Sequence, residues 1–166
     1  GKLLEKHAEE ALRNPLLIAF TMLGFGIVLA LADRFGEKIK NLDHIKPMHA
    51  FLIGCSQALA LIPGVSRSGS TMTTGLVLGF KRADVARFSF LMAIPITFGA
   101  GLLKIKDLGT GVNTLELAIG FITAAVVGFL SIRFLLRGLA KKDFTLFVWY
   151  RIAFAVLILA VYFARQ

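Results

Sequence analysis

Four long runs of apolar residues constrain this sequence more than any other feature. Each run is about 18 to 22 residues long and nearly free of charge, which is the length that an α-helix needs to cross the hydrocarbon core of a bilayer. The chain as a whole is 57% hydrophobic and only 17% charged, a composition far from that of soluble domains. We therefore predict an all-α integral membrane protein, a polytopic helical bundle whose spans cover residues 15–32, 85–103, 115–136 and 144–164.

Two further apolar segments, residues 48–62 and 71–80, are too short to span a bilayer comfortably. If residues 48–80 enter and leave the membrane by the same face, all the clusters of basic residues in the chain lie on one side. We therefore predict a re-entrant hairpin over these residues, with its tip at residues 63–70 inside the membrane. Irregular backbone at that depth is tolerated only where protein encloses it or where it lines a watery cavity, so the hairpin predicts a functional site.

The charge of the chain predicts its orientation. The formal net charge is +9, and we attribute it to the loops of a membrane protein and expect no nucleic-acid partner. The positive-inside rule places the basic clusters in the cytoplasm, and it places residues 104–114 and the C-terminus outside. The clusters are Arg34, Lys38, Lys40 and Lys46; Lys81, Arg82 and Arg87; and Arg133, Arg137, Lys141 and Lys142.

Residues 1–14 alternate charged and apolar side chains at helical spacing, which predicts a short amphipathic helix in the membrane interface. They lack the continuous apolar core and the small-residue cleavage site of a signal peptide. Because the chain begins with Gly in place of Met, we expect it to be processed, tagged or cut from a longer protein.

The tip of the predicted hairpin reads Pro63-Gly-Val-Ser-Arg-Ser-Gly-Ser-Thr71. Gly64 and Gly69 permit unusual backbone angles and close approach of a ligand. A half-helix that begins near Ser70 would direct free N–H groups at an anion. Arg67 adds a planar fork of donors that suits two phosphate oxygens, and an arginine inside a membrane by default marks a functional site.

Four hydroxyl side chains complete the tip, and each is a candidate to bind a phosphate oxygen or to act as a nucleophile: Ser66, Ser68, Ser70 and Thr71. The structural alternative for each serine is a helix N-cap, and for the small residues together it is helix packing.

Residues 57–71, Gln-Ala-Leu-Ala-Leu-Ile-Pro-Gly-Val-Ser-Arg-Ser-Gly-Ser-Thr, strongly resemble the second signature of the bacterial undecaprenyl-pyrophosphate phosphatases, the bacitracin-resistance family. Asn14-Pro15, Asp33-Arg34 and residues 88–95 also look like this family, so the resemblance covers the chain from about Leu3 as the C-terminal two-thirds of a member. It implies hydrolysis of undecaprenyl pyrophosphate at the outer face of the bacterial inner membrane, to recycle the lipid carrier of cell-wall synthesis. The implied fold is an inverted repeat with two re-entrant hairpins, often dimeric.

The resemblance also implies roles for the residues of the tip. Arg67 and Ser66 are the candidate catalytic residues; Arg67 would neutralise charge that builds on the diphosphate. The candidate substrate-binding residues are Gly64, Ser68, Gly69, Ser70, Thr71 and Gln57, the last of which would orient the loop.

A first, Glu-rich signature of the family has no counterpart in this chain, so we expect the N-terminal part of the same enzyme to lie outside it. We expect a divalent cation, Mg or Ca, whose ligands come from that missing part, because the predicted tip contains no carboxylate. The nucleophile stays open between a serine of the missing part, a metal-activated water and Ser66.

Two other functional classes remain open on the sequence alone. Broken helices with an arginine and half-helix N-termini also bind anions in transporters, so a polyprenyl-phosphate flippase or an anion carrier is the alternative to a phosphatase. A membrane scaffold without catalytic activity is the third reading, favoured by the missing signature and disfavoured by the intact Arg67 loop.

Overall fold

The computed structural model describes residues 14–105, 113–139 and 143–165, and the regular structure of these residues is helical apart from one isolated β-bridge between Lys40 and Phe80. All but the last residue of the predicted interfacial helix, residues 1–14, lies outside the described residues. So do the basic residues Lys141 and Lys142. The elements, in order, are α2 (Pro15–Phe35), η1 (Leu42–His44), α3 (Pro47–Gln57), η2 (Ala58–Leu61), α4 (Arg67–Val77), α5 (Arg82–Ile105), α6 (Thr114–Leu139) and α7 (Thr145–Ala164).

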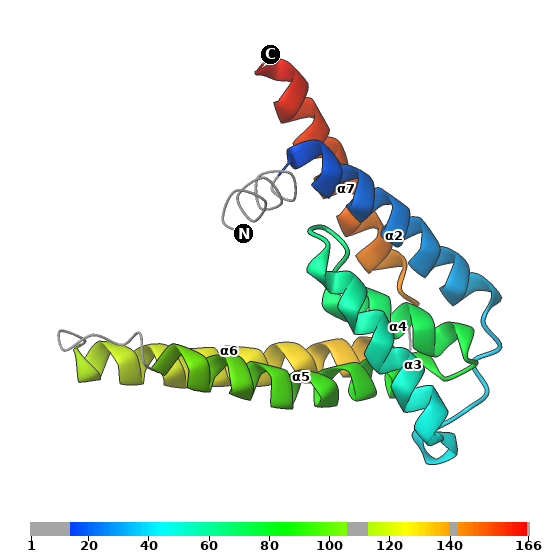
Figure 1. Cartoon of the computed structure of the whole chain (residues 1–166), viewed down its shortest axis with the longest axis horizontal. Helices are drawn as coiled ribbons and strands as arrows, with labels where there is room; N and C mark the ends of the chain where they lie inside the picture. The colour runs from blue at the N-terminus through cyan, green and yellow to red at the C-terminus, as the bar shows by residue number, and fades with distance from the viewer. Residues whose placement is uncertain (1–13, 106–112, 140–142, 166) are drawn as a thin grey trace, which may run out of the picture.

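The four long helices α2, α5, α6 and α7 correspond to the four predicted spans (Figure 1). Each contains an 18-residue window with a mean hydropathy of 1.6 to 2.3, and each is long enough to cross a bilayer. The prediction of an all-α membrane protein is therefore confirmed. Helices α2, α5 and α6 extend slightly beyond the predicted spans, whereas α7 begins one residue later than predicted. Helix α2 continues through Phe35, so that Asp33 is helical, and Pro95 lies inside α5 without ending it.

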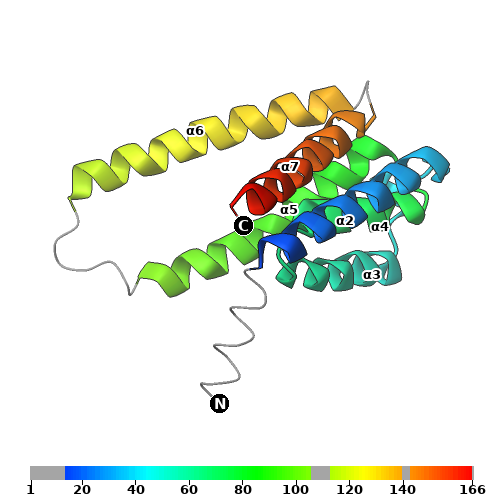
Figure 2. The same ribbon diagram turned by 90° about the horizontal axis from the view of Figure 1, so that it is seen from above.

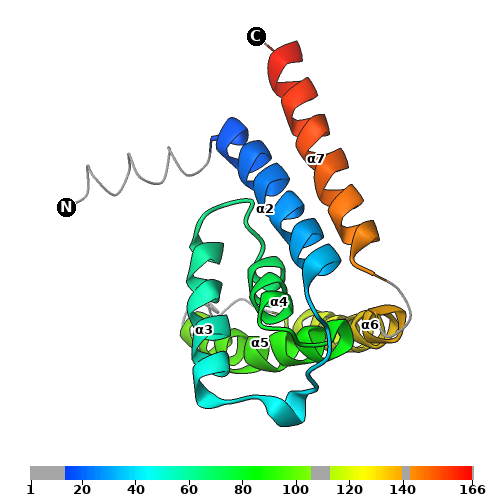
Figure 3. The same ribbon diagram turned by 90° about the vertical axis from the view of Figure 1, so that its right-hand side faces the viewer.

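Helices α2 and α7 pack against each other in antiparallel fashion (Figure 3). Pro15 occupies the first turn of α2, where a missing N–H costs nothing, and the Asn14 side chain accepts a hydrogen bond from Leu16 N at 2.9 Å. Gly26, in the middle of α2, lies against Arg151 of α7; a Cβ on Gly26 would be 3.6 Å from the Cβ of Arg151. The pair therefore brings a cation to the middle of the bundle.

The two short arms of the predicted hairpin are α3, continued by η2, and α4, which lie side by side. At the base of the hairpin the rings of His49 and Phe80 meet edge to face, 5.2 Å between centroids. At the tip, Thr21 Oγ1 of α2 donates to Pro63 O at 2.6 Å. The hairpin thus begins and ends at the base and turns back beside the first half of α2. Its placement within a membrane stays a prediction.

Helices α5 and α6 form a second antiparallel pair that extends away from the other helices (Figures 1 and 2). The most apolar window of α6 has no buried residue, so this helix presents its side chains to lipid or to further protein. The core sits where the helices converge, at the base of the hairpin. It consists of Leu29, Ala32, Met72, Leu76, Phe80, Val85, Ala86, Leu139 and Phe144.

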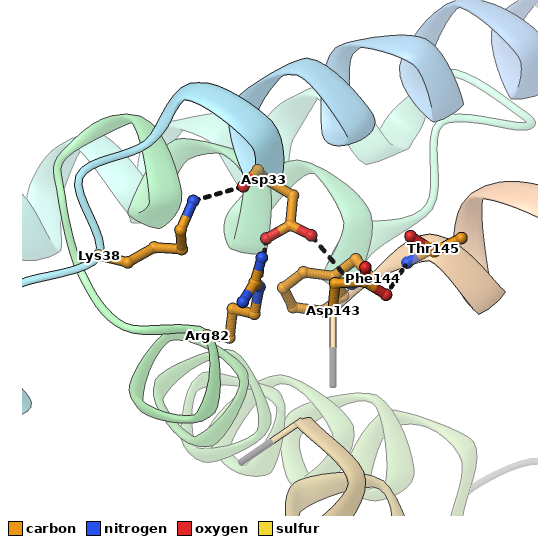
Figure 4. Close-up of polar contacts among 6 residues, drawn as sticks. All are labelled: Asp33, Lys38, Arg82, Asp143, Phe144 and Thr145. Atoms are coloured by element: carbon orange, nitrogen blue, oxygen red, sulfur yellow. Dashed lines mark hydrogen bonds and ion pairs between the residues drawn. The ribbon is translucent and has the colours of Figure 1, made fainter. Parts of the chain in front are cut away.

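Asp33 joins three helices beside this core (Figure 4). Its side chain is buried, its Oδ1 lies 2.5 Å from Arg82 Nε at the start of α5, and its Oδ2 accepts a hydrogen bond from Phe144 N, just before α7, at 3.0 Å. Lys38 Nζ donates to the backbone oxygen of Asp33. One carboxylate therefore fixes the ends of α2, α5 and α7 relative to one another.

Replacing Asp33 with Ala should lower the free energy of unfolding by about 2 kcal/mol, because it leaves the amide of Phe144 and the guanidinium of Arg82 without their acceptor. The measurement is the thermal midpoint in detergent, with Asp43→Ala, an exposed carboxylate outside this contact, as the control. Equal midpoints for the two variants would show that the Asp33 contact does not stabilise the fold.

Candidate active site

The loop that joins η2 to α4 has two residues with positive φ angles, Gly64 at 88° and Ser66 at 69°. For a non-glycine residue such a conformation costs free energy, and residues held in it cluster at functional sites. Ser66 caps α4, since its Oγ accepts a hydrogen bond from Gly69 N at 3.3 Å. The N-cap role that the sequence allowed for each serine thus falls to Ser66.

The half-helix begins at Arg67, earlier than the predicted start near Ser70. The reason is the Ser66 cap: Ser70 N already donates to Ser66 O at 3.0 Å, as in the body of a helix. The amide groups that lack an intrahelical acceptor are therefore those of the first turn, which Arg67 opens. This correction moves the positive end of the helix dipole from Ser70 to the Arg67 region.

A cavity of about 750 Å³ opens beside this loop. Its polar lining comes from Gly64 and Ser66 of the loop, from Ser68 and Gly69 in the first turn of α4, and from Arg151 of α7. The remainder of the lining is apolar or aromatic and comes from five helices and the residue before α7: Met22, Leu29, Met72, Phe90, Leu135, Phe144, Leu146, Phe147 and Tyr150.

The cavity borders about two turns of α2. Met22 and Leu29 both line it and are about 10 Å apart along the helix axis at 1.5 Å per residue. Met22 is close to the polar end, because its backbone oxygen accepts a hydrogen bond from Arg151 Nε at 3.3 Å. Leu29 and Phe144 belong to the apolar core at the base of the hairpin. The cavity therefore runs from a cationic, hydroxyl-bearing end to an apolar end.

Arg151 is the functional candidate that the sequence analysis missed. Only 7% of this residue is exposed, and its Nη2 donates to Gly64 O at 2.7 Å. A Cβ on Gly69 would lie 3.4 Å from its Nη1, so the guanidinium also lies close to the first turn of α4. The signal was present in the sequence, since Arg151 stands within the last apolar run, where an ionisable residue is costly and marks function by default.

The predicted site residues divide into four groups. Gly64, Ser66, Ser68 and Gly69 line the same cavity, and their binding of substrate stays a prediction. Arg67 is exposed and is not among the lining residues, although it lies between two serines that are. Its contact with a ligand stays a prediction.

Ser70 and Thr71 are buried and brace the loop from inside. Ser70 Oγ donates to Arg67 O at 2.9 Å. The Thr71 hydroxyl lies 3.1 Å from the same oxygen and 2.7 Å from Ser89 Oγ of α5. Direct phosphate binding by these hydroxyls stays a prediction, because in this structure both are engaged within the protein.

Gln57, the last residue of α3, lies away from the cavity lining. Its Oε1 is buried and has no hydrogen-bond partner among the residues that the structure describes. Its predicted role in orienting the loop is therefore untested.

A divalent cation does not fit the residues that line this cavity. Carboxylate oxygens are the ligands such a cation prefers, and the lining described above contains none. Within residues 14–105, 113–139 and 143–165, no three His, Cys, Asp or Glu side chains gather into a possible metal site. The expectation that the ligands come from outside this chain stays a prediction.

Comparison with known proteins identifies the family. The family model described as bacitracin resistance protein BacA matches residues 1–157. This chain belongs to the bacitracin resistance protein family. The resemblance seen in residues 57–71 is thereby confirmed.

Members of the bacitracin resistance family similar to this chain are named undecaprenyl-diphosphatase. The protein from Moorella thermoacetica is 51% identical over 166 residues, which cover 100% of this chain and 64% of the relative. The protein from Pelotomaculum thermopropionicum is 48% identical, and the match covers 63% of its length. The protein from Trichlorobacter lovleyi is 45% identical, and the match covers 61% of its length. The chain thus spans slightly less than two thirds of the length of these relatives.

Replacing Arg151 with Gln should lower the free energy of unfolding by about 2 to 3 kcal/mol, because Gly64 O and Met22 O lose a charged donor. The same change should slow any reaction at the loop at least tenfold. Thermal midpoints measure the first effect, and Arg133→Gln, an exposed arginine on α6, is the matched control. A midpoint equal to that of the control would contradict the bracing role.

Proposed function

We propose that this chain forms the anion-binding part of an undecaprenyl-diphosphatase, which hydrolyses undecaprenyl diphosphate to undecaprenyl phosphate and phosphate and so recycles the lipid carrier of cell-wall synthesis. One observation carries the proposal: a single cavity is lined by Gly64, Ser66, Ser68, Gly69 and Arg151 on one side and by apolar side chains such as Leu29 and Phe144 on the other. This shape suits an amphiphile with a charged diphosphate head and a long isoprenoid tail. The names of the relatives support the same substrate.

The loop contributes charge stabilisation to this reaction. During phosphoryl transfer, negative charge on the terminal phosphate is stabilised by positioned donors and cations. Arg151 reaches the cavity directly, while Arg67 adds a second guanidinium at the start of α4. The hydroxyls of Ser66 and Ser68 are placed to donate to phosphate oxygens.

The bond that breaks joins the terminal phosphorus to the oxygen that bridges the two phosphates. The oxygen of the attacking group forms the new bond to that phosphorus, and undecaprenyl phosphate leaves. An attacking water loses a proton to solvent and gives phosphate directly. An attacking serine loses its proton to solvent and forms a phosphoserine, which a water then hydrolyses to phosphate and the free serine. Ser66 is the one exposed hydroxyl of this loop that lines the cavity in a strained conformation. It is the nucleophile that this chain itself can offer, and a serine or an activated water from the remaining third of the enzyme is the alternative.

The proposed enzyme lies in the bacterial inner membrane with its loop toward the periplasm. The support is the distribution of charge, since Arg34, Lys38 and Arg82 gather at the base, opposite the end of α2 that contacts the tip. The exposed surfaces of α5 and α6 would pack against lipid, the remaining third of the same enzyme, or a second copy in a homodimer.

The experiment measures phosphate release from undecaprenyl diphosphate in detergent, by this chain alone and by the chain joined to the remaining third of a family member. We expect release only from the joined protein. A joined protein that is folded and releases no phosphate would contradict the phosphatase proposal.

A transporter is the second candidate, because a broken-helix hairpin whose half-helix starts beside Arg151 also suits anion transport. Reconstitution of the joined protein in vesicles distinguishes the two. Movement of a polyprenyl phosphate across the bilayer, without phosphate release, would support the flippase.

A further inference from the structure

We infer that a second cavity, at the C-terminal end of α2 and the N-terminal end of α7, binds the phosphate headgroup of an anionic phospholipid. This cavity has a volume of about 510 Å³ and is lined by Arg34, Lys38 and Arg82, together with Asp33 and Asp143. Asp33 and Met22, whose backbone oxygen accepts a hydrogen bond from Arg151, are about 16 Å apart along α2. The second cavity is therefore separate from the proposed diphosphate site.

Two of its cations have no carboxylate partner among the residues that the structure describes. Within that part of the chain the one ion pair joins Arg82 and Asp33. Lys38 donates to the backbone oxygen of Asp33, which is a neutral acceptor. Arg34 is exposed, and its recorded contact is with the ring of Phe35, 5.8 Å from the centroid. Three cations against two carboxylates leave the lining with a net positive charge.

The negative charge of Asp143, which also lines the cavity, repels an anionic headgroup and weakens its binding. The carboxylate is engaged locally, because it accepts a hydrogen bond from Thr145 N at 3.1 Å (Figure 4). Hydrogen bonds from Thr145 and the nearby guanidinium of Arg82 hold the pKa of Asp143 below its usual value. Asp143 therefore accepts from the first amide of α7, and its charge is already compensated in part.

The walls of the cavity indicate that its ligand is a lipid. Ala30, Val148 and Ile152 are apolar, and Trp149 is 64% exposed. These residues belong to the last turns of α2 and the first turns of α7. The ends of membrane-spanning helices lie at the boundary between headgroups and acyl chains, where tryptophan side chains are enriched. A headgroup phosphate would meet Arg34 and Lys38, and the first acyl carbons would meet the apolar wall. Basic pockets between membrane helices bind anionic headgroups in this way.

The chain carries a single tryptophan, Trp149, and it lines this cavity. The test is therefore the quenching of its fluorescence in detergent by phosphatidylglycerol with brominated acyl chains, compared with phosphatidylcholine carrying the same chains. We expect phosphatidylglycerol to quench at a lower lipid fraction. Equal quenching by the two lipids in the parent chain would overturn the inference without the need for any variant.

The double variant Arg34→Gln/Lys38→Gln should weaken the preference for phosphatidylglycerol about 30-fold, taking the usual contribution of two cations near a membrane surface. The matched control is Lys81→Gln/Arg87→Gln, which removes the same charge from exposed residues outside the cavity. It should keep the preference. An unchanged preference in the first variant would overturn the inference.

Inorganic phosphate distinguishes a lipid headgroup from free phosphate. Millimolar phosphate should leave the quenching by phosphatidylglycerol unchanged, because the apolar wall contributes nothing to binding a free ion. Complete displacement by phosphate would overturn the lipid assignment and indicate a site for the free anion. The charge-conserving variant Arg34→Lys/Lys38→Arg checks that folding is intact, and it should retain the preference.

Discussion

Replacing Arg67 with Ala should lower the rate of phosphate release by the joined enzyme about 100-fold to 1,000-fold, the effect of removing one donor that stabilises charge in a transition state. Arg67 opens α4, next to the strained Ser66 and to the cavity-lining Ser68. Because its side chain is exposed and makes no hydrogen bond among the described residues, its loss should leave the fold intact. The measurement is kcat and KM with undecaprenyl diphosphate, together with the thermal midpoint.

Arg87→Ala is the matched control for Arg67→Ala, since Arg87 is an exposed arginine near the base of the hairpin and outside the cavity. We expect it to retain the parental rate. A second variant, Arg67→Lys, separates charge from geometry; it should recover only part of the rate, because a lysine cannot form the planar fork that holds two phosphate oxygens. Parental kcat in Arg67→Ala, with a normal midpoint, would remove Arg67 from the site.

Replacing Gly64 with Ala should be the most damaging single change to the structure. A Cβ there would lie 2.1 Å from Thr21 Oγ1 and 2.6 Å from Ile18 O, and the φ angle of 88° is unfavourable for any residue with a Cβ. Strain and overpacking together should lower the free energy of unfolding by about 4 kcal/mol. Thr21 cannot move aside cheaply, since its hydroxyl donates to Pro63 O at 2.6 Å and also lies 2.9 Å from Leu17 O and 3.0 Å from Ile18 O.

The same change should also reduce phosphate release by about 100-fold in molecules that remain folded, because a shift of about 1 Å in a positioning group has that effect. Gly54→Ala is the matched control: Gly54 lies in α3 of the same hairpin, and a Cβ there meets nothing within 4 Å. It should leave both the midpoint and the rate unchanged. A Gly64→Ala protein with parental stability would show that the loop can withdraw from α2 freely.

The loop region illustrates how far a sequence predicts a site. The run of residues 63–71 is local in the chain, so its glycines, hydroxyls and arginine were recognised without a structure. The cavity, however, is built by segments that are remote in sequence. Arg151 donates a hydrogen bond to Gly64 O, and the two residues are 87 positions apart in the chain. No local sequence pattern predicts this contact.

The sequence also could not predict which hydroxyl side chains face the cavity and which are buried. Ser66 and Thr71 are both small hydroxyl residues of one motif, yet the first is exposed at the cavity and the second is fully buried against Ser89. The difference arises because Ser66 precedes α4 and caps it, whereas Thr71 lies on the face of α4 that packs on α5.

The sequence by itself determined the class of the protein, its four long helices, the broken hairpin and the chemistry of its tip, since hydropathy, helix length and turn chemistry are properties of local segments. The tertiary structure alone decided which side chains share a space. In the folded chain Arg151 contacts the loop, Ser70 and Thr71 are buried, and Asp33 binds Arg82 and Phe144. These contacts depend on which face of each helix packs against its neighbours, and the local sequence does not determine that face.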